Sequence, residues 1–266
     1  MRSDSSHAMR YDSIMPTPEE SPIWRTSSAS ATEQARDRLI VALDVPDAAT
    51  AAAFVERLEG TCKWFKVGLE LYVAEGPRVL EPLFAKGHSV FLDLKLHDIP
   101  NTVAGAVRSA AKLGAQMLTL HAGGGPAMLA AAQMALEGTA HPPQLLAVTV
   151  LTSMDQAQAS AVGLNRSPAE QVELLARMGL EAGLRGFVCS PEEVARLRSI
   201  TGPEGVLVIP GIRPAGAAVG DQKRIATPAD ALRQGASYLV VGRPITQAQE
   251  PARAAETILQ EMARAF

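Results

Sequence analysis

The most informative part of the chain is residues 91–102, which read FLDLKLHDIPNT. Asp93 and Lys95 follow an apolar run and are two positions apart, so on a strand both side chains point to one face, opposite to Leu94. A carboxylate and an ammonium at the end of a buried strand are costly unless they pair and are used. A purely structural ion pair is the alternative, but it does not explain Asp98 or the Ile-Pro-Asn-Thr turn. The segment therefore predicts a functional site.

Around this segment, apolar runs alternate with amphipathic, Ala-rich stretches from Leu39 onward. The runs expected to form strands are residues 39–43, 64–67, 89–94, 117–120, 145–150, 186–189, 206–209 and 238–241. The stretches expected to form helices include 48–58, 77–85, 103–113, 126–136, 169–180, 191–198 and 228–233. Pro or Asp opens several of them, and glycine follows several, as helix starts and ends prefer.

Eight strands, each followed by a helix, predict an α/β fold with a closed parallel sheet, a single (β/α)8 TIM barrel. The alternative is an open doubly wound sheet, but no Gly-rich dinucleotide turn follows the first strand. The barrel is expected to occupy residues 38–266. Residues 1–37 are rich in Ser, Thr, Pro and charge, and are expected to be a disordered extension that ends in a short helix over 32–38, with Trp24 docked.

Composition excludes several classes of function. A net charge of −3 gives no basic surface for nucleic acid or an anionic membrane, and no apolar run approaches the ~20 residues that span a bilayer. Cys62 and Cys189 lie beside apolar runs and are expected to be buried thiols of a cytoplasmic protein. No Cys or paired-His spacing typical of a metal site is present, so no metal is expected.

Polar residues recur where the expected strands end, and in a TIM barrel those ends form the active site. They are Asp44, Lys66, Asp93, Lys95, His121, Thr152, Ser153, Gly211, Arg213, Gly242 and Arg243. Asp44 alone could cap a helix, and His121 is expected to be a loop residue rather than a catalyst. A purely structural explanation does not account for the alternation of acidic and amine side chains on neighbouring strands.

The ends of the last two strands indicate a phosphate site. Barrels often bind phosphate between these loops, at the start of a helix. Gly242 lets the backbone approach closely, Arg243 offers a bidentate guanidinium, and Pro244 is expected to open the final helix. Residues 211–222 are expected to form a mobile lid, with Gln222 near its end.

With these residues in place, the chain from Leu39 onward resembles the orotidine 5′-phosphate decarboxylase family, in its bacterial branch. The specific match is Asp93-Leu-Lys95-Leu-His-Asp98-Ile-Pro-Asn-Thr102. Supporting matches occur at residues 43–44, 65–68, 149–153, 210–214, 220–222 and 241–245. The resemblance implies conversion of orotidine monophosphate to uridine monophosphate and CO2 in pyrimidine biosynthesis, without cofactor or metal.

The resemblance also implies a homodimer whose two active sites are shared between subunits. In it, Lys95 is the proton donor to the C6 carbanion. The residues implied in catalysis are Lys66, Asp93, Lys95 and the partner subunit's Asp98. Those implied in binding the nucleotide are Asp44, Lys66, Asp93, the partner subunit's Thr102, Thr152, Arg213, Gln222, Gly242 and Arg243. Asp44 would hold the ribose, Thr152 the pyrimidine edge, and Gly242 with Arg243 the phosphate.

Two alternatives remain open at this point. One is a sister enzyme on the same scaffold that stabilises an enediolate with Mg²⁺, because such enzymes share the Asp-x-Lys-x-x-Asp core. Lys66 argues against it, since a cation there is a poor neighbour for a divalent metal. The other is a barrel that binds a nucleotide without catalysis, although every charged position of the pattern is present.

Overall fold

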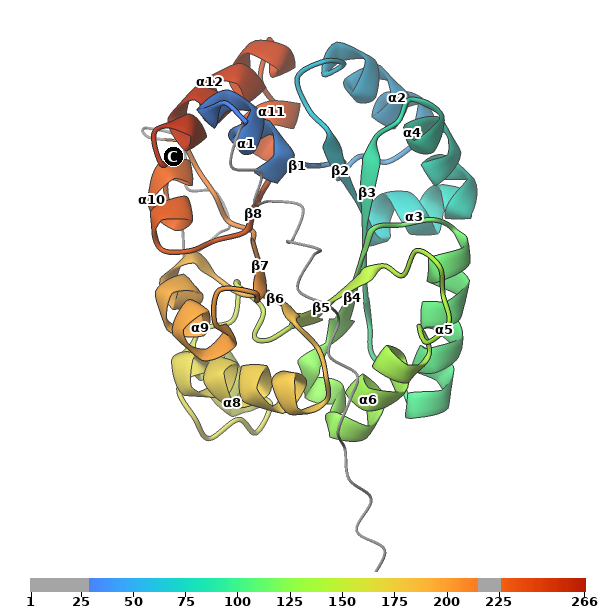
Figure 1. Ribbon diagram of the computed structural model, residues 1–266, viewed down its shortest axis with the longest axis vertical. Coiled ribbons are helices and arrows are strands. Elements are labelled where there is room, and N and C mark those ends of the chain that lie inside the picture. The colour runs from blue at the N-terminus through green and yellow to red at the C-terminus, as the bar shows by residue number, and fades with distance from the viewer. Residues whose placement is uncertain (1–28, 215–225) are drawn as a thin grey trace, which may run out of the picture.

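The computed structural model describes residues 29–214 and 226–266, and it shows a closed barrel of eight parallel strands in sequence order (Figure 1). The strands are β1 Leu39–Ala42, β2 Trp64–Gly68, β3 Ser89–Leu96, β4 Met117–His121, β5 Gln144–Val148, β6 Gly186–Val188, β7 Val206–Ile209 and β8 Tyr238–Val241. The ring closes because β1 pairs with both β2 and β8, with Ile40 opposite Trp64 and Val240. The predicted α/β TIM barrel is confirmed.

Helices surround the sheet and bury its outer face. They are α1 Ala31–Arg38, α2 Ala48–Arg57, α3 Leu69–Glu75, η1 Gly76–Leu80, α4 Glu81–Ala85, α5 Pro100–Lys112, η2 Ala122–Gly124, α6 Pro126–Met134, α7 Gln156–Ala161, α8 Pro168–Glu181, η3 Pro191–Glu193, α9 Val194–Thr201, α10 Pro228–Arg233, α11 Arg243–Thr246 and α12 Pro251–Ala263. Within the described ranges, none of these helices has the length and the apolar character that a membrane crossing requires.

Local sequence signals explain where these helices start and end. The Asp47 carboxylate accepts from the Thr50 N–H at 2.7 Å and caps α2, so Asp47, rather than Asp44, is the capping residue. Two expectations need correction. Residues 77–85 form a 3₁₀ turn followed by α4 rather than one helix, and Pro244 opens only the single-turn α11. The helix α11 ends at Thr246, and the last helix of the chain is α12, which begins at Pro251.

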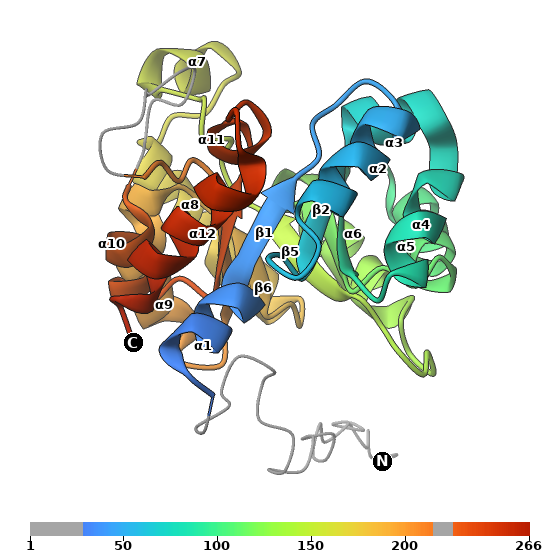
Figure 2. The same ribbon diagram turned by 90° about the horizontal axis from the view of Figure 1, so that it is seen from above.

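The N-terminal part of the described chain lies at the end of the barrel opposite α7 and α11 (Figure 2). The helix expected over residues 32–38 is present as α1, Ala31–Arg38, and it packs against α12. Arg38 places its guanidinium 4.6 Å from the centroid of the Phe266 ring. The expected disorder of the preceding segment and the docking of Trp24 concern residues 1–28, outside the described part.

Two apolar cores follow from the alternation of side chains along the strands. The larger core lies between the strands and the helices. The smaller one fills the inside of the barrel, and its members are Ile40, Ala42, Trp64, Phe91, Met117, Leu146, Val206, Val208, Tyr238 and Val240. Trp64 and Tyr238 begin their strands and meet edge to face, with ring centroids 5.4 Å apart. They therefore plug the barrel at the N-terminal end of the sheet.

Arg198 of α9 joins three segments at this plugged end. Its guanidinium donates to the carbonyl oxygens of Gly202 at 2.8 Å, Gly205 at 2.7 Å and Gly235 at 2.6 Å, and to the Ser237 hydroxyl at 3.0 Å. These acceptors lie after α9, before β7 and before β8. One side chain thus links three backbone carbonyls of the segments that lead into β7 and β8.

Replacing this side chain tests its structural role. Arg198→Ala is expected to lower the free energy of unfolding by about 2–4 kcal/mol, because several half-buried carbonyls lose their donors together. Urea unfolding followed by circular dichroism measures the change. Arg253→Ala is the matched control, because Arg253 makes only an exposed ion pair with Glu250 at 3.3 Å and is expected to contribute little. Equal effects of the two substitutions would contradict this role.

Candidate active site

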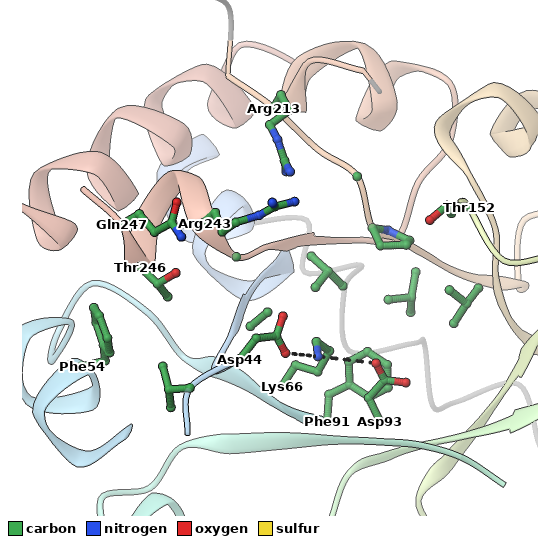
Figure 3. A pocket seen from close by; sticks show the side chains of 18 of the residues that line it. Asp44, Phe54, Lys66, Phe91, Asp93, Thr152, Arg213, Arg243, Thr246 and Gln247 are labelled. Carbon is green, nitrogen blue, oxygen red and sulfur yellow. Dashed lines mark hydrogen bonds and ion pairs between the residues drawn. The ribbon is translucent and has the colours of Figure 1, made fainter. Parts of the chain in front are cut away.

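A row of alternating charges lies at the C-terminal ends of β1, β2 and β3. The Lys66 ammonium is 2.8 Å from Asp44 Oδ1 and 3.5 Å from Asp93 Oδ2. The Lys95 ammonium donates to both carboxylate oxygens of Asp93, at 2.8 and 2.7 Å. Asp93 therefore lies between two cations, and Lys66 between two carboxylates. Figure 3 shows the first part of the row, Asp44, Lys66 and Asp93.

The strand period explains why these charges face the inside of the barrel. Along β2, Trp64 and Lys66 share the inner face, and along β3, Phe91 shares it with Asp93. The register places Lys66 opposite Phe91 and Gly68 opposite Asp93. On the inner face of each of these two strands, an aromatic side chain that fills the barrel is thus followed by a charged one at its mouth.

Burial strengthens the electrostatic interactions among the charges of this row. Lys66 and Asp93 are each 8% exposed. Burial by itself lowers the pKa of Lys66, but Asp93 and Asp44 reverse this effect and hold its pKa above the ordinary value. Burial by itself raises the pKa of Asp93, but Lys66 and Lys95, with hydrogen bonds from Lys95 and Thr119, hold its pKa below the ordinary value. The arrangement therefore keeps Lys66 and Asp93 charged although both are buried.

Gly68 provides the space that the row needs. A Cβ atom at this position would lie 2.8 Å from the Lys66 ammonium nitrogen and 3.3 Å from Asp44 Oδ1. Any side chain at position 68 would therefore displace the Lys66–Asp44 pair. The glycine is required by the charges beside it rather than by its own backbone conformation.

The charged row lines a cavity of about 510 Å³, within the usual range for small-molecule sites. Its residues are Ala42, Asp44, Val45, Phe54, Lys66, Phe91, Asp93, Lys95, Thr152, Val188, Val208, Pro210, Gly211, Arg213, Val240, Gly242, Arg243, Thr246 and Gln247. The cavity has a floor of apolar barrel side chains and a polar wall contributed by several strand ends, as ligand sites in such barrels do.

Two guanidinium groups form a second charged region of this cavity. Arg213 follows β7, and Arg243 begins α11 after β8. Figure 3 shows their side chains extending toward one another, apart from Asp44, Lys66 and Asp93. Burial lowers the pKa of Arg213, and the positive charge of Arg243 lowers it further. Two cations held close together make this end of the cavity suitable for an anion.

The structure brings together most of the residues that the sequence predicts for the site. Those that line the cavity are Asp44, Lys66, Asp93, Lys95, Thr152, Arg213, Gly242 and Arg243. Asp98 and Thr102 do not line it, and both are exposed at the start of α5, where the Asp98 carboxylate accepts from the Ile99 N–H at 2.6 Å. Gln222 and most of the expected lid lie outside the described residues.

Some residues of the site were not predicted. Thr246 and Gln247 line the cavity through the turn of α11, for which the sequence carried no periodic signal. Thr119 is buried on β4 and donates to Asp93 Oδ1 at 2.9 Å. A hydroxyl among the apolar residues of an inner strand face is the signal that would have found it. His121 ends β4 and lies beside His97, with ring centroids 5.5 Å apart, and is not part of the cavity wall.

The donor atoms of this site suit an organic anion better than a metal ion. Lys66 occupies the space between the two carboxylates, Asp44 and Asp93, that would otherwise offer oxygen ligands. In the two described ranges, no group of three or more His, Cys, Asp or Glu side chains is arranged to hold a metal.

Comparisons with known proteins agree on one family. Residues 37–258 match the family described as "Orotidine 5′-phosphate decarboxylase / HUMPS family". A Moorella thermoacetica protein named orotidine 5′-phosphate decarboxylase is 51% identical over 234 residues, covering 86% of this chain and 93% of that protein. A Nostoc protein of the same name is 52% identical over 234 residues, covering 85% and 97%. The crystal structure of orotidine 5′-phosphate decarboxylase from Lactobacillus acidophilus superposes with a TM-score of 0.74 at 39% identity, covering 85% and 98%.

The coupling within the row predicts a pH effect on stability. The folded-state pKa of Asp93 lies below its ordinary value of 3.8. Its stabilising contribution is therefore complete above about pH 4 and is lost as the pH falls through the folded-state value. Asp93→Asn is expected to be less stable near neutral pH, because two ammonium groups lose their shared counter-charge, and to lose less stability on acidification.

Urea unfolding of both proteins at several pH values between about 6 and 3 measures this difference. The control is Glu256→Gln, which neutralises an exposed carboxylate on α12 and is expected to leave the pH dependence unchanged. An Asp93→Asn protein as stable as the parent at neutral pH, with an equally steep acid decline, would contradict the coupling.

Proposed function

The chain belongs to the orotidine 5′-phosphate decarboxylase / HUMPS family, and from this premise we propose that it removes CO2 from orotidine monophosphate with Lys95 as the proton donor. It is a carbon–carbon lyase that forms uridine monophosphate, a step of pyrimidine biosynthesis. The observation that carries the proposed mechanism is the buried Lys66–Asp93–Lys95 row in a cavity that also contains two arginines.

The chemistry explains why a lysine suits the reacting position. Loss of CO2 from C6 of the pyrimidine leaves an electron pair in an orbital that the ring delocalises poorly. A preorganised ammonium beside C6 stabilises this charge as it develops and then supplies a proton to the same atom. Lys95 is one-third exposed at its side chain and lines the cavity, so it can approach a bound nucleotide.

The neighbouring charges keep this ammonium ready to react. Asp93 contacts Lys95 through both carboxylate oxygens, which fixes the orientation of the ammonium group. Lys66 in turn balances the charge of Asp93 and bonds to Asp44. We assign transition-state stabilisation to this row as its main effect, and repulsion between Asp93 and the substrate carboxylate as a secondary one.

The phosphate of the nucleotide is assigned to the arginine end of the cavity. Arg243 and Arg213 supply positive charge, and Gly242 lets the backbone come close at the start of α11. Binding energy gained there acts away from the reacting carbon and helps to orient the base over Lys95. We assign Asp44 to the ribose hydroxyls, Thr152 to the pyrimidine edge, and Gln222 to a bridge between phosphate and base.

We further propose that the enzyme acts as a homodimer with shared sites. Asp98 and Thr102 belong to the matched motif, yet within their own subunit both are exposed and outside the cavity wall. Ile99 between them is 67% exposed, and on the neighbouring β2–α3 unit Leu69 and Val73 are also exposed apolar residues. An apolar surface beside two motif residues supports their use by a second copy of the chain.

The metal-dependent sister reaction is the nearest competitor, because it uses the same acid–lysine core. The Lys66 ammonium, held between Asp44 and Asp93, disfavours a divalent cation at that place. We also propose a cytoplasmic location and no cofactor. Cys62 and Cys189 are buried cysteines that are not joined in a disulfide, which fits a reducing compartment.

The proposed reaction is tested by mixing the purified protein with orotidine monophosphate in excess chelator and following the loss of the orotate chromophore. Turnover is expected to be unaffected by the chelator. Lys95→Ala is expected to lower kcat by on the order of 10³-fold or more while retaining uridine monophosphate binding, because it removes both the stabilising charge and the proton.

Lys63→Ala is the control for this substitution, because Lys63 pairs with Asp37 on the surface at 2.9 Å and does not line the cavity. Chelator-sensitive turnover would favour the metal-dependent reaction. Near-normal turnover by a folded Lys95→Ala protein would remove Lys95 from the donor role.

Site sharing is tested by mixing two inactive proteins, Lys95→Ala and Asp98→Ala, under conditions that exchange subunits. Random pairing is expected to restore about a quarter of the parent's activity, because half of the dimers then contain one site with both native residues. The matched control mixes Lys95→Ala with Asp93→Ala. These two residues act within one chain, so this mixture is expected to stay inactive. Mixed dimers of the first pair without activity would contradict sharing.

A further inference from the structure

The strand that carries the reacting lysine is irregular at that residue. Leu92 pairs with Leu118 and Leu96 with Leu120, so β3 uses four residues where β4 uses two. The extra length places Lys95 in a bulge, where the regular ladder of backbone hydrogen bonds is interrupted. Bulges of this kind change the direction in which a side chain points.

At this position, the backbone of Lys95 adopts an unusual conformation. Its φ of 50° lies in the left-handed region, and among the described residues it is the only non-glycine with positive φ. A long side chain in this region is strained by about 1–3 kcal/mol, and such a conformation persists only where neighbouring groups hold it. The structure must therefore contain a contact that stabilises the bulge.

Thr119 provides this contact from the facing strand. It is the one residue of β4 between Leu118 and Leu120, and its hydroxyl oxygen accepts from the Lys95 backbone N–H at 2.9 Å. The same hydroxyl donates to Asp93 Oδ1 at 2.9 Å. A hydroxyl has one proton to donate and lone pairs to accept with, so both bonds form together.

The burial of Thr119 indicates that its hydroxyl is retained for the hydrogen bonds it makes. The residue is 0% exposed and lies on an inner strand face, where an unpaired hydroxyl is unfavourable and valine would fit the same volume. Both of its side-chain hydrogen bonds go to the bulge, one to each of the two residues that form the closest ion pair of the site.

We propose that Thr119 is a positioning residue for the decarboxylation, because its hydroxyl ties the Asp93 carboxylate and the strained backbone of Lys95 into one geometry. This inference rests on the proposed function of Lys95. Without the hydroxyl, the Lys95 N–H loses its acceptor and the Asp93 carboxylate loses a donor. The ammonium then samples orientations in which it does not face the reacting carbon.

The test compares Thr119→Val, which keeps the shape but removes the hydroxyl, with Thr119→Ser, which keeps the hydroxyl. Thr119→Val is expected to lower kcat about 10- to 100-fold with a much smaller change in KM, because the arginine end of the cavity is untouched. Thr119→Ser is expected to recover most of the lost kcat. Thermal unfolding is measured on each protein.

Ser237→Ala is the matched control at the opposite end of the barrel. Its hydroxyl is also buried and also joins a backbone N–H of the neighbouring strand, that of Leu207, to a charged side chain, that of Arg198. Its loss is expected to lower the melting temperature without changing kcat. A similar loss of kcat in this control would show that the Thr119 effect is only structural.

Three other outcomes would overturn the inference: unchanged kcat in Thr119→Val, equal losses in the Val and Ser proteins, or a Thr119→Val protein that does not fold. Turnover of orotidine monophosphate by the parent enzyme is measured beside them. A parent without turnover refutes the proposed function itself. An active parent with an equally active Thr119→Val protein refutes only the role of Thr119.

Discussion

The carboxylate of Asp93, held between two ammonium groups inside the barrel, is the interaction on which the rest of the site depends. Either cation alone would leave a buried pair with a large desolvation penalty, and the carboxylate alone would take up a proton. The neighbouring features follow from it. Gly68 leaves room for Lys66, Asp44 completes the row, and the β3 bulge brings Lys95 within 2.7 Å of Asp93.

In the cavity, the residues assigned to phosphate binding and those assigned to the reaction lie at the ends of different strands. Arg213 and Arg243 follow the last two strands, whereas the acid–amine row lies at the C-terminal ends of the first three. This division lets a ligand be held firmly at one end without neutralising the charges at the other. Because no metal takes part in the proposed reaction, the electrostatic field in that proposal comes from fixed side chains, and their burial makes the field strong.

Much of this could be predicted from the sequence, and the remainder depends on how distant strands align. The ends of β7 and β8 were predicted to the residue, because short apolar runs bounded by Gly, Pro or Ser mark buried strands. Asp93 and Lys95 were found by their spacing of two along one strand, and Asp44 and Lys66 by their places at the ends of the first two expected strands. The bulge, the left-handed Lys95 and the double role of Thr119 were not, because they arise from the register between β3 and β4. The roles proposed for Asp98 and Thr102 involve a second copy of the chain, so one chain alone does not place them at the site.

The edge-to-face pair of Trp64 and Tyr238 closes the barrel at the end opposite the mouth of the cavity. With aromatic rings closing the far end of the sheet, nothing can pass through the barrel, and whatever enters by the mouth must leave by it. The substrate and both products of the proposed reaction therefore share one opening, at the carboxyl ends of the strands.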